Sequence, residues 1–138
     1  MVHRTSFRVR FGELDPYNHV NHAVYVAWFE AGRGEALEAA GMSLQHMASQ
    51  GWQVVVTELH VRFRVAAVAG DEVIVETWLT EVGGATSRWA QRLMLGDTVL
   101  CEAELRAGST DAHGKPIRTP REVADALRTM VLATPSNE

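Results

Sequence analysis

Beyond residue 51 the chain alternates apolar and polar residues with a period of two. Four runs share this pattern: residues 58–65, 72–80, 87–95 and 99–107. Period-two alternation predicts strands that each bury one face. Gly83-Gly84 predicts a two-residue hairpin turn between the second and third runs, and Gly96-Asp97 predicts another tight turn. Turns this short pair strands antiparallel, so the pattern favours a meandering antiparallel sheet.

Residues 21–40, which precede these runs, are predicted to form one helix, with Asn21 as its N-cap and Gly41 just past its end. Apolar side chains surround this segment on nearly every side, so the helix needs burial over most of its surface. Gly32 and Gly34 each cost about 1 kcal/mol of helix stability relative to alanine. We interpret both as points where the helix backbone touches another element.

Residues 5–11 also alternate and predict one strand before the helix, with Phe7, Val9 and Phe11 on its buried side. Near the other end, residues 119–122 (Thr-Pro-Arg-Glu) have the pattern of a capping box with proline at the first helical position. The short C-terminal helix that follows is predicted to bury Val123, Leu127 and Met130.

The long helix is the only large apolar object that can cover the apolar face of the predicted sheet. The predicted fold is therefore α+β, a five-stranded antiparallel sheet wrapped around one long central helix, with a short C-terminal helix. No internal repeat or linker interrupts the sequence, so residues 1–138 are expected to form a single domain.

Composition excludes several classes of function. The 138 residues carry a net charge of −4 and no basic run of the kind that follows nucleic acid. No apolar run approaches the ~20 residues that span a bilayer, and the polar N-terminus lacks the apolar core of a signal peptide. Cys101 is the only cysteine, so no intramolecular disulfide can form. We expect a cytoplasmic protein that binds neither nucleic acid nor membrane.

Residues 15–22 (Asp-Pro-Tyr-Asn-His-Val-Asn-His) concentrate polar side chains directly before the long helix. The first turn of a helix presents backbone N–H groups without intrahelical acceptors and the positive end of the macrodipole. Both features stabilise a developing oxyanion. The Asp15 carboxylate, a few residues upstream, can act as a base or as a nucleophile. The segment therefore predicts both parts of an acyl-transfer site.

The order of elements resembles the hotdog fold. Residues 11–15 (Phe-Gly-Glu-Leu-Asp) and 19–25 (His-Val-Asn-His-Ala-Val-Tyr) resemble the 4-hydroxybenzoyl-CoA thioesterase group of hotdog enzymes. The broader relatives of this group are YbgC-type acyl-CoA thioesterases and plant acyl-ACP thioesterases. The downstream segments that also match are residues 59–63, 70–73 and 114–116. The resemblance implies hydrolysis of an acyl-CoA thioester to a free acid and coenzyme A.

Carried over residue by residue, the resemblance implies that Asp15 is the catalytic aspartate and that the His22 backbone N–H binds the thioester oxygen. His19 and Asn18 would orient groups nearby. Asn21 and His22 stand where the 4-hydroxybenzoyl-CoA enzymes carry aromatic residues, which argues against that acyl group. No cofactor is implied, because coenzyme A is part of the substrate. No metal is expected, since the two histidines lack a metalloprotease spacing and an evident further ligand.

The residues predicted to bind substrate are Asn18, Asn21, Tyr25, Thr57, Glu58, Arg62 and Arg88. Thr57 and Glu58 begin a strand that can pass near Asp15 of a partner subunit, although a polar strand edge explains them equally well. Arg62 and Arg88 can meet the phosphates of coenzyme A, although arginines on strands are more often solvated or paired.

An open sheet exposes edge strands, which are a liability unless they are paired or covered. We therefore expect a homodimer whose sheets join edge to edge, or a dimer of such dimers, with each site at the subunit interface as the family implies. Three other functions stay open: hydrolysis of an acyl carrier protein thioester, hydration or dehydration of an acyl chain, and acyl-CoA binding without turnover.

Overall fold

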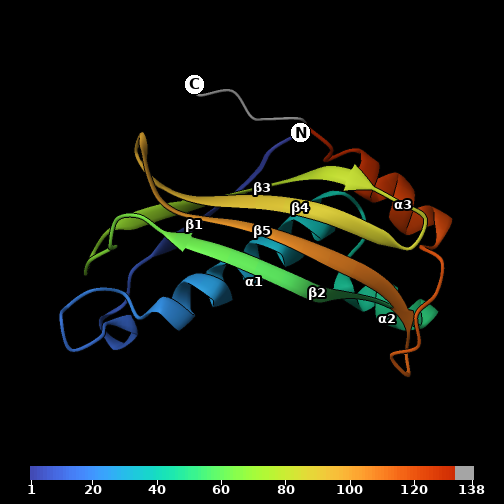
Figure 1. Cartoon of the computed structure of the whole chain (residues 1–138), viewed down its shortest axis with the longest axis horizontal. Coiled ribbons are helices and arrows are strands. Elements are labelled where there is room, and N and C mark those ends of the chain that lie inside the picture. Colours follow the sequence, from blue (N-terminus) through green and yellow to red (C-terminus); the bar gives the residue numbers. More distant parts are fainter. Residues whose placement is uncertain (133–138) are drawn as a thin grey trace.

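The computed structural model describes residues 1–132 and consists of one antiparallel sheet with helices packed against it (Figure 1). In chain order the elements are β1 (His3–Arg8), a 3-10 turn η1 (Phe11–Glu13), α1 (His22–Ala39), α2 (Leu44–Gln50), β2 (Trp52–Phe63), β3 (Glu72–Val82), β4 (Thr86–Leu95), β5 (Thr98–Asp111) and α3 (Arg121–Arg128). The spatial order is β1-β3-β4-β5-β2, and all neighbouring strands are antiparallel. The α+β fold predicted from the sequence is confirmed.

Helix α1 lies along one face of the sheet (Figure 1) and begins and ends where the sequence predicts. Asn21 is its N-cap, and Gly41 adopts a positive φ of 84° just past its end. A Cβ on Gly32 would lie 2.7 Å from Val75 Cγ1, so this glycine is a close-approach point. The same interpretation is wrong for Gly34, which has no atom within 4 Å of its Cβ position and borders an open cavity.

Two apolar clusters occupy the space between the sheet and the helices. The first half of α1 packs Trp28 and Phe29 against the middle strands, while Leu37 from its second half packs with residues of α2 and α3. Alanines 23, 27 and 31 are exposed. The sheet therefore covers one side of α1 rather than most of its surface, and the prediction of all-round burial does not hold within this chain.

The N-terminal strand ends earlier than the alternation predicts. The backbone N–H of Val9 donates to Asp71 O at 2.9 Å, and the Arg10 N–H then donates to the Glu13 side chain at 2.7 Å, which closes η1. The turn carries Phe11 away from the core, and its side chain is 88% exposed rather than buried. A local side-chain hydrogen bond thus overrides the period-two pattern.

Other local predictions also need correction. The β3–β4 connection spans residues 83–85 rather than two residues, and Gly83 N–H donates to Thr86 O at 2.7 Å. Thr119 does not cap α3, because its hydroxyl lies 3.0 Å from Ser109 Oγ while Pro120 occupies the N-cap position. The predicted apolar face of α3 is confirmed, since its valine and leucine side chains are buried.

Helix α2 was not predicted, although its end signals are present in the sequence. The Ser43 hydroxyl accepts the His46 N–H at 3.0 Å, and Gly51 ends the helix with a φ of 78°. Within residues 1–132, no helix has the length and apolar character needed to cross a bilayer.

Candidate active site

Asp15 lies in a tight loop that leads directly into α1. Its Oδ1 atom accepts hydrogen bonds from the Tyr17 N–H at 2.8 Å and the His19 N–H at 3.1 Å. Asn18 completes the turn with a φ of 61°, a conformation that asparagine tolerates better than most residues. Asp15 Oδ2 has no hydrogen-bond partner within residues 1–132. The loop therefore fixes one carboxylate oxygen and leaves the other available to a water or a substrate.

The β2–β3 connection anchors this loop to the sheet. The Val20 N–H donates to Ala67 O at 2.9 Å, and the Ala67 N–H donates to the hydroxyl of Tyr25 at 2.9 Å. Tyr25, predicted to bind substrate, is instead buried beneath the loop. Burial raises the pKa of Tyr25, and the negative charges of Asp15 and Asp71 raise it further. Tyr25 thus supports the β2–β3 connection that holds the Asp15 loop.

The first turn of α1 offers one free backbone donor. Asn21, predicted to bind substrate, caps the helix by accepting the Ala23 N–H on Oδ1 at 2.9 Å. The N–H of His22 has no acceptor within the part of the chain that the structure describes. It lies at the positive end of an 18-residue helix. A single preorganised N–H in this position can stabilise an oxyanion.

Phe63, at the end of β2, brings the edge of the sheet to the helix tip. The His22 imidazole meets the Phe63 ring edge-on, with centroids 6.3 Å apart, and Tyr25 contacts the same ring at 5.4 Å. The His19 side chain is exposed and has no hydrogen-bond partner among the described residues. Of the two predicted histidines, His19 therefore belongs to the Asp15 loop and His22 begins the helix that follows it. No group of three or more His, Cys, Asp or Glu side chains in residues 1–132 is placed to hold a metal ion.

Thr57 and Glu58 are distant from Asp15 of the same chain. Thr57 is the extra residue of a β-bulge in β2, and its hydroxyl donates to Arg106 O at 3.1 Å. Phe63 lies six residues further along the strand, which is about 20 Å at the usual strand rise. Thr57 and Glu58 therefore cannot reach the Asp15 loop of their own chain; they can approach that loop only in a second subunit.

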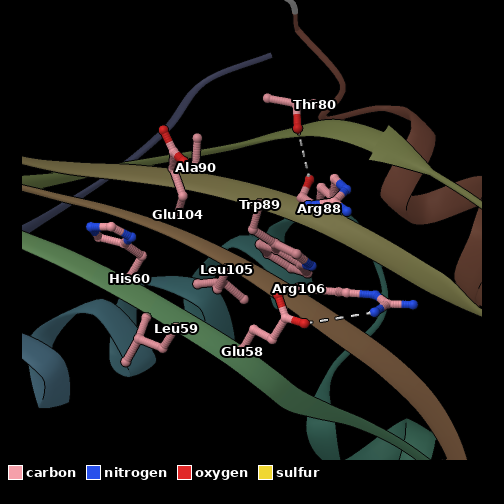
Figure 2. Close-up of a pocket in the computed structure, with 10 residues that line it drawn as sticks. All are labelled: Glu58, Leu59, His60, Thr80, Arg88, Trp89, Ala90, Glu104, Leu105 and Arg106. Carbon is pink, nitrogen blue, oxygen red and sulfur yellow. Dashed lines mark hydrogen bonds and ion pairs between the residues drawn. The ribbon is translucent and has the colours of Figure 1, made fainter.

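The predicted phosphate-binding arginines lie on the sheet face opposite α1. Arg88 and Glu58 line a cavity of about 580 Å³ on that face, as Figure 2 shows. The ion pairs here are Glu58–Arg106, Arg62–Glu104 and Arg88–Glu81, with N–O distances of 3.8, 3.8 and 3.6 Å. Arg88 lies five residues before Leu93 of β4, and Leu93 is level with Phe63 across β5. Within one chain, Arg88 is therefore remote from Asp15.

Sequence reasoning missed a buried polar network under α1. Gln91 is 1% exposed, and its Nε2 donates to Phe29 O at 2.8 Å and to Thr77 Oγ1 at 3.0 Å. Its Oε1 accepts from Arg33 Nη1 at 2.9 Å. The available signal was a glutamine at a position that the alternation assigns to the core. The network ties the middle of α1 to the sheet.

Comparison with known proteins bears on what this site does. A family model described as the thioesterase-like superfamily matches residues 9–127. The chain belongs to this superfamily. The Haemophilus influenzae acyl-CoA thioesterase YbgC is 35% identical over 122 residues. This match covers 87% of this chain and 90% of YbgC.

Two other relatives extend the comparison. The chloroplastic acyl-acyl carrier protein thioesterase ATL3 of Arabidopsis thaliana is 28% identical, over 88% of this chain and 65% of its own length. The crystal structure of a probable thioesterase from Bartonella henselae superimposes with a TM-score of 0.83 at 27% identity, covering 87% of this chain and 100% of that one. The resemblance to hotdog thioesterases drawn from the sequence is thereby confirmed.

Proposed function

We propose that this protein hydrolyses acyl-CoA thioesters to a free acid and coenzyme A. The observation that carries the proposal is the arrangement of Asp15 beside the start of α1. One carboxylate oxygen is held by two backbone N–H groups, the other is free, and the unpaired His22 N–H lies at the start of the helix into which the loop leads. The names of the YbgC relative and of the Bartonella structure support the same reaction.

In the proposed reaction, Asp15 Oδ2 accepts a proton from a water while the water oxygen bonds to the thioester carbon. The carbonyl oxygen becomes an oxyanion, which accepts a hydrogen bond from the His22 N–H. Collapse of this intermediate breaks the carbon–sulfur bond, and the departing thiolate takes the proton from Asp15. Direct attack by the carboxylate is the second route: the carbon–sulfur bond breaks as the acyl–Asp15 anhydride forms, the thiolate leaves, and water then hydrolyses the anhydride and supplies the thiolate with its proton. His19 and Asn18 belong to the same loop as Asp15 and would orient the water.

We propose further that two subunits pair along the free edges of β2. This strand is 12 residues long and exposes Val55, Val56, Leu59 and Phe63 by 37%, 43%, 41% and 53%. A long apolar edge of this kind is a liability unless another strand covers it. Antiparallel pairing of two β2 strands directs the bulge at Thr57 of one subunit toward the Phe63 end of the other. That arrangement supports a role for Thr57 and Glu58 in the partner's site.

The test is thiol release from acyl-CoA substrates by an Asp15→Asn variant. Asparagine Oδ1 can keep both backbone hydrogen bonds, so the fold should persist while kcat falls by about 10²–10⁴. Asp111 provides a matched control, because its Oδ1 accepts the N–H groups of His113 and Lys115, both at 2.9 Å, in the same i+2 and i+4 pattern. Asp111→Asn should retain wild-type turnover.

Turnover by Asp15→Asn within tenfold of wild type would remove Asp15 from its role. Binding of acyl-CoA by the wild type without thiol release would identify a sensor instead. Supplying the same acyl group on coenzyme A and on acyl carrier protein separates those two substrates, and a strong preference for the carrier protein would favour the function of the Arabidopsis relative.

A further inference from the structure

We propose that the pocket between β1 and η1 binds the phosphorylated nucleotide end of coenzyme A, with Arg8 and Arg10 as its phosphate ligands. The proposal rests on the acyl-CoA thioesterase function and assigns a place to the part of the substrate that does not react. The pocket has a volume of about 470 Å³ and includes Arg8, Arg10, Glu13 and Trp28 in its lining.

The floor of this pocket is aromatic. The rings of Phe7 and Trp28 stack with centroids 6.0 Å apart and an interplanar angle of 19°. Trp28 is buried, whereas Phe7 is partly exposed at the sheet edge. Aromatic surfaces beside guanidinium groups bind a purine and its phosphates by stacking and by charge-assisted hydrogen bonds. The lining chemistry therefore fits a phosphorylated adenosine.

The charge distribution singles out these two arginines. The arginines on or next to the strands that pair with carboxylates are Arg4, Arg62, Arg64, Arg88, Arg92 and Arg106. Arg8 and Arg10 are exposed and have no ion-pair partner within residues 1–132. Glu13 also lines the pocket, but its Oε1 already accepts the Arg10 backbone N–H at 2.7 Å. Glu72 lies opposite Arg8 in the β1–β3 ladder, but no ion pair joins the two side chains.

The position of the pocket matches the connectivity of coenzyme A. Glu13 borders the pocket and precedes Asp15 by two residues, a step of at most about 7 Å along the chain. The flexible pantetheine arm, which joins the thioester sulfur to the first phosphate, is longer than this step. A thioester at Asp15 can therefore place its phosphates at Arg8 and Arg10 without leaving the surface of the same subunit.

Binding measurements test the proposal without requiring turnover. Isothermal titration of the full chain would compare coenzyme A, 3′-dephospho-coenzyme A and pantetheine. We expect Arg8→Gln and Arg10→Gln each to weaken binding of coenzyme A by about tenfold, the order of one charge-assisted hydrogen bond, and to leave pantetheine binding unchanged. Arg121→Gln is the control, because Arg121 is also exposed and without an ion pair among the described residues, but lies on α3.

Kinetics supply the second readout. With acyl-CoA the two variants should raise KM and keep kcat, while with the matching acyl-pantetheine they should change neither constant. Equal effects on both substrates, or unchanged binding of coenzyme A, would overturn the proposal. The proposal would also be overturned if the Arg8 and Arg10 variants lost activity only with an acyl carrier protein substrate. A loss of coenzyme A affinity in Arg88→Gln, with none in the Arg8 and Arg10 variants, would overturn it as well. Hydrolysis that survives in Asp15→Asn would contradict only the proposed mechanism. It would leave the binding proposal intact, because the titrations measure binding and not hydrolysis.

Discussion

Asp15 and His19 are hydrogen-bonded to each other twice. The Asp15 backbone N–H donates to His19 O at 2.7 Å, and Asp15 Oδ1 accepts the His19 N–H at 3.1 Å. The following residue, Val20, is bonded to Ala67 of the β2–β3 connection. The relative positions of the carboxylate, the N-terminus of α1 and the end of the sheet are therefore fixed before any substrate binds. Such preorganisation is what stabilisation of an oxyanion requires.

Removing the Tyr25 hydroxyl should loosen this anchor. Tyr25→Phe leaves the Ala67 N–H without its acceptor in a buried place, and we expect the free energy of unfolding to fall by about 1–3 kcal/mol. Tyr17→Phe is the control, because Tyr17 belongs to the same loop but is 79% exposed. Urea unfolding measures both variants. Equal stability of the two would show that the hydroxyl of Tyr25 does not hold the loop.

The two glycines of α1 should respond to alanine with opposite signs. In Gly32→Ala the new Cβ would lie 2.7 Å from Val75 Cγ1, and overpacking of this kind costs about 1–3 kcal/mol. In Gly34→Ala the new methyl group meets nothing within 4 Å, so better helix propensity should add about 0.5–1 kcal/mol. Thermal unfolding distinguishes them, and destabilisation of comparable size in both would contradict the assignment of a single close approach.

Stability should fall at high pH because of Cys101. Burial raises the pKa of its thiol to about 12 in the folded protein, while in the unfolded chain the thiol ionises near its ordinary value. The unfolded state therefore loses the proton first, and the free energy of unfolding decreases as pH rises from about 9 to 12, by up to about 1.4 kcal/mol per pH unit. Cys101→Ala should lack this part of the slope. Parallel pH–stability curves for the two proteins would contradict the explanation.

Charge on the edge of β2 should separate the proposed dimer. Leu59→Asp places a carboxylate on the free edge strand, where Leu59 is 41% exposed, so we expect a monomer with little activity. Ile74→Asp is the matched control, since Ile74 lies on β3 and is 39% exposed. Sedimentation velocity reports the mass of each variant. A wild type that sediments as a monomer, or a Leu59→Asp variant that stays dimeric, would exclude this interface.

Local patterns were sufficient for most of the fold. The alternation around Val73, Val75 and Leu93 identified core positions correctly, and Asn21 and Gly41 marked the ends of the long helix. Failures occurred where a side chain competed with the pattern. The Glu13 carboxylate closes η1 and ends β1 early, and the hydroxyl of Thr119 turns to Ser109 instead of capping α3.

For the candidate site, the sequence placed Asp15 just before the start of the long helix, but it did not reveal the contacts around them. Tyr25 appeared as a pocket residue because only its helical position was visible, whereas its hydroxyl bonds to a residue 42 positions away. Gln91 attracted no attention because its partners, Phe29 and Thr77, come from two other elements. Arg62 and Arg88 pair with Glu104 and Glu81 on neighbouring strands, and a strand pairing of this kind cannot be read from the sequence alone.

The sequence by itself determined the long helix, the five strands, the core-facing side of β3, β4 and β5, and the closeness of Asp15 to the helix start, because caps, turns and periodicity act over a few residues. Only the tertiary structure decided that β2 forms a free edge, that Phe63 meets His22, and that Arg8 and Arg10 lie unpaired beside an aromatic pocket. These features depend on strand order and register, which join residues far apart in the chain, and short-range patterns do not encode them.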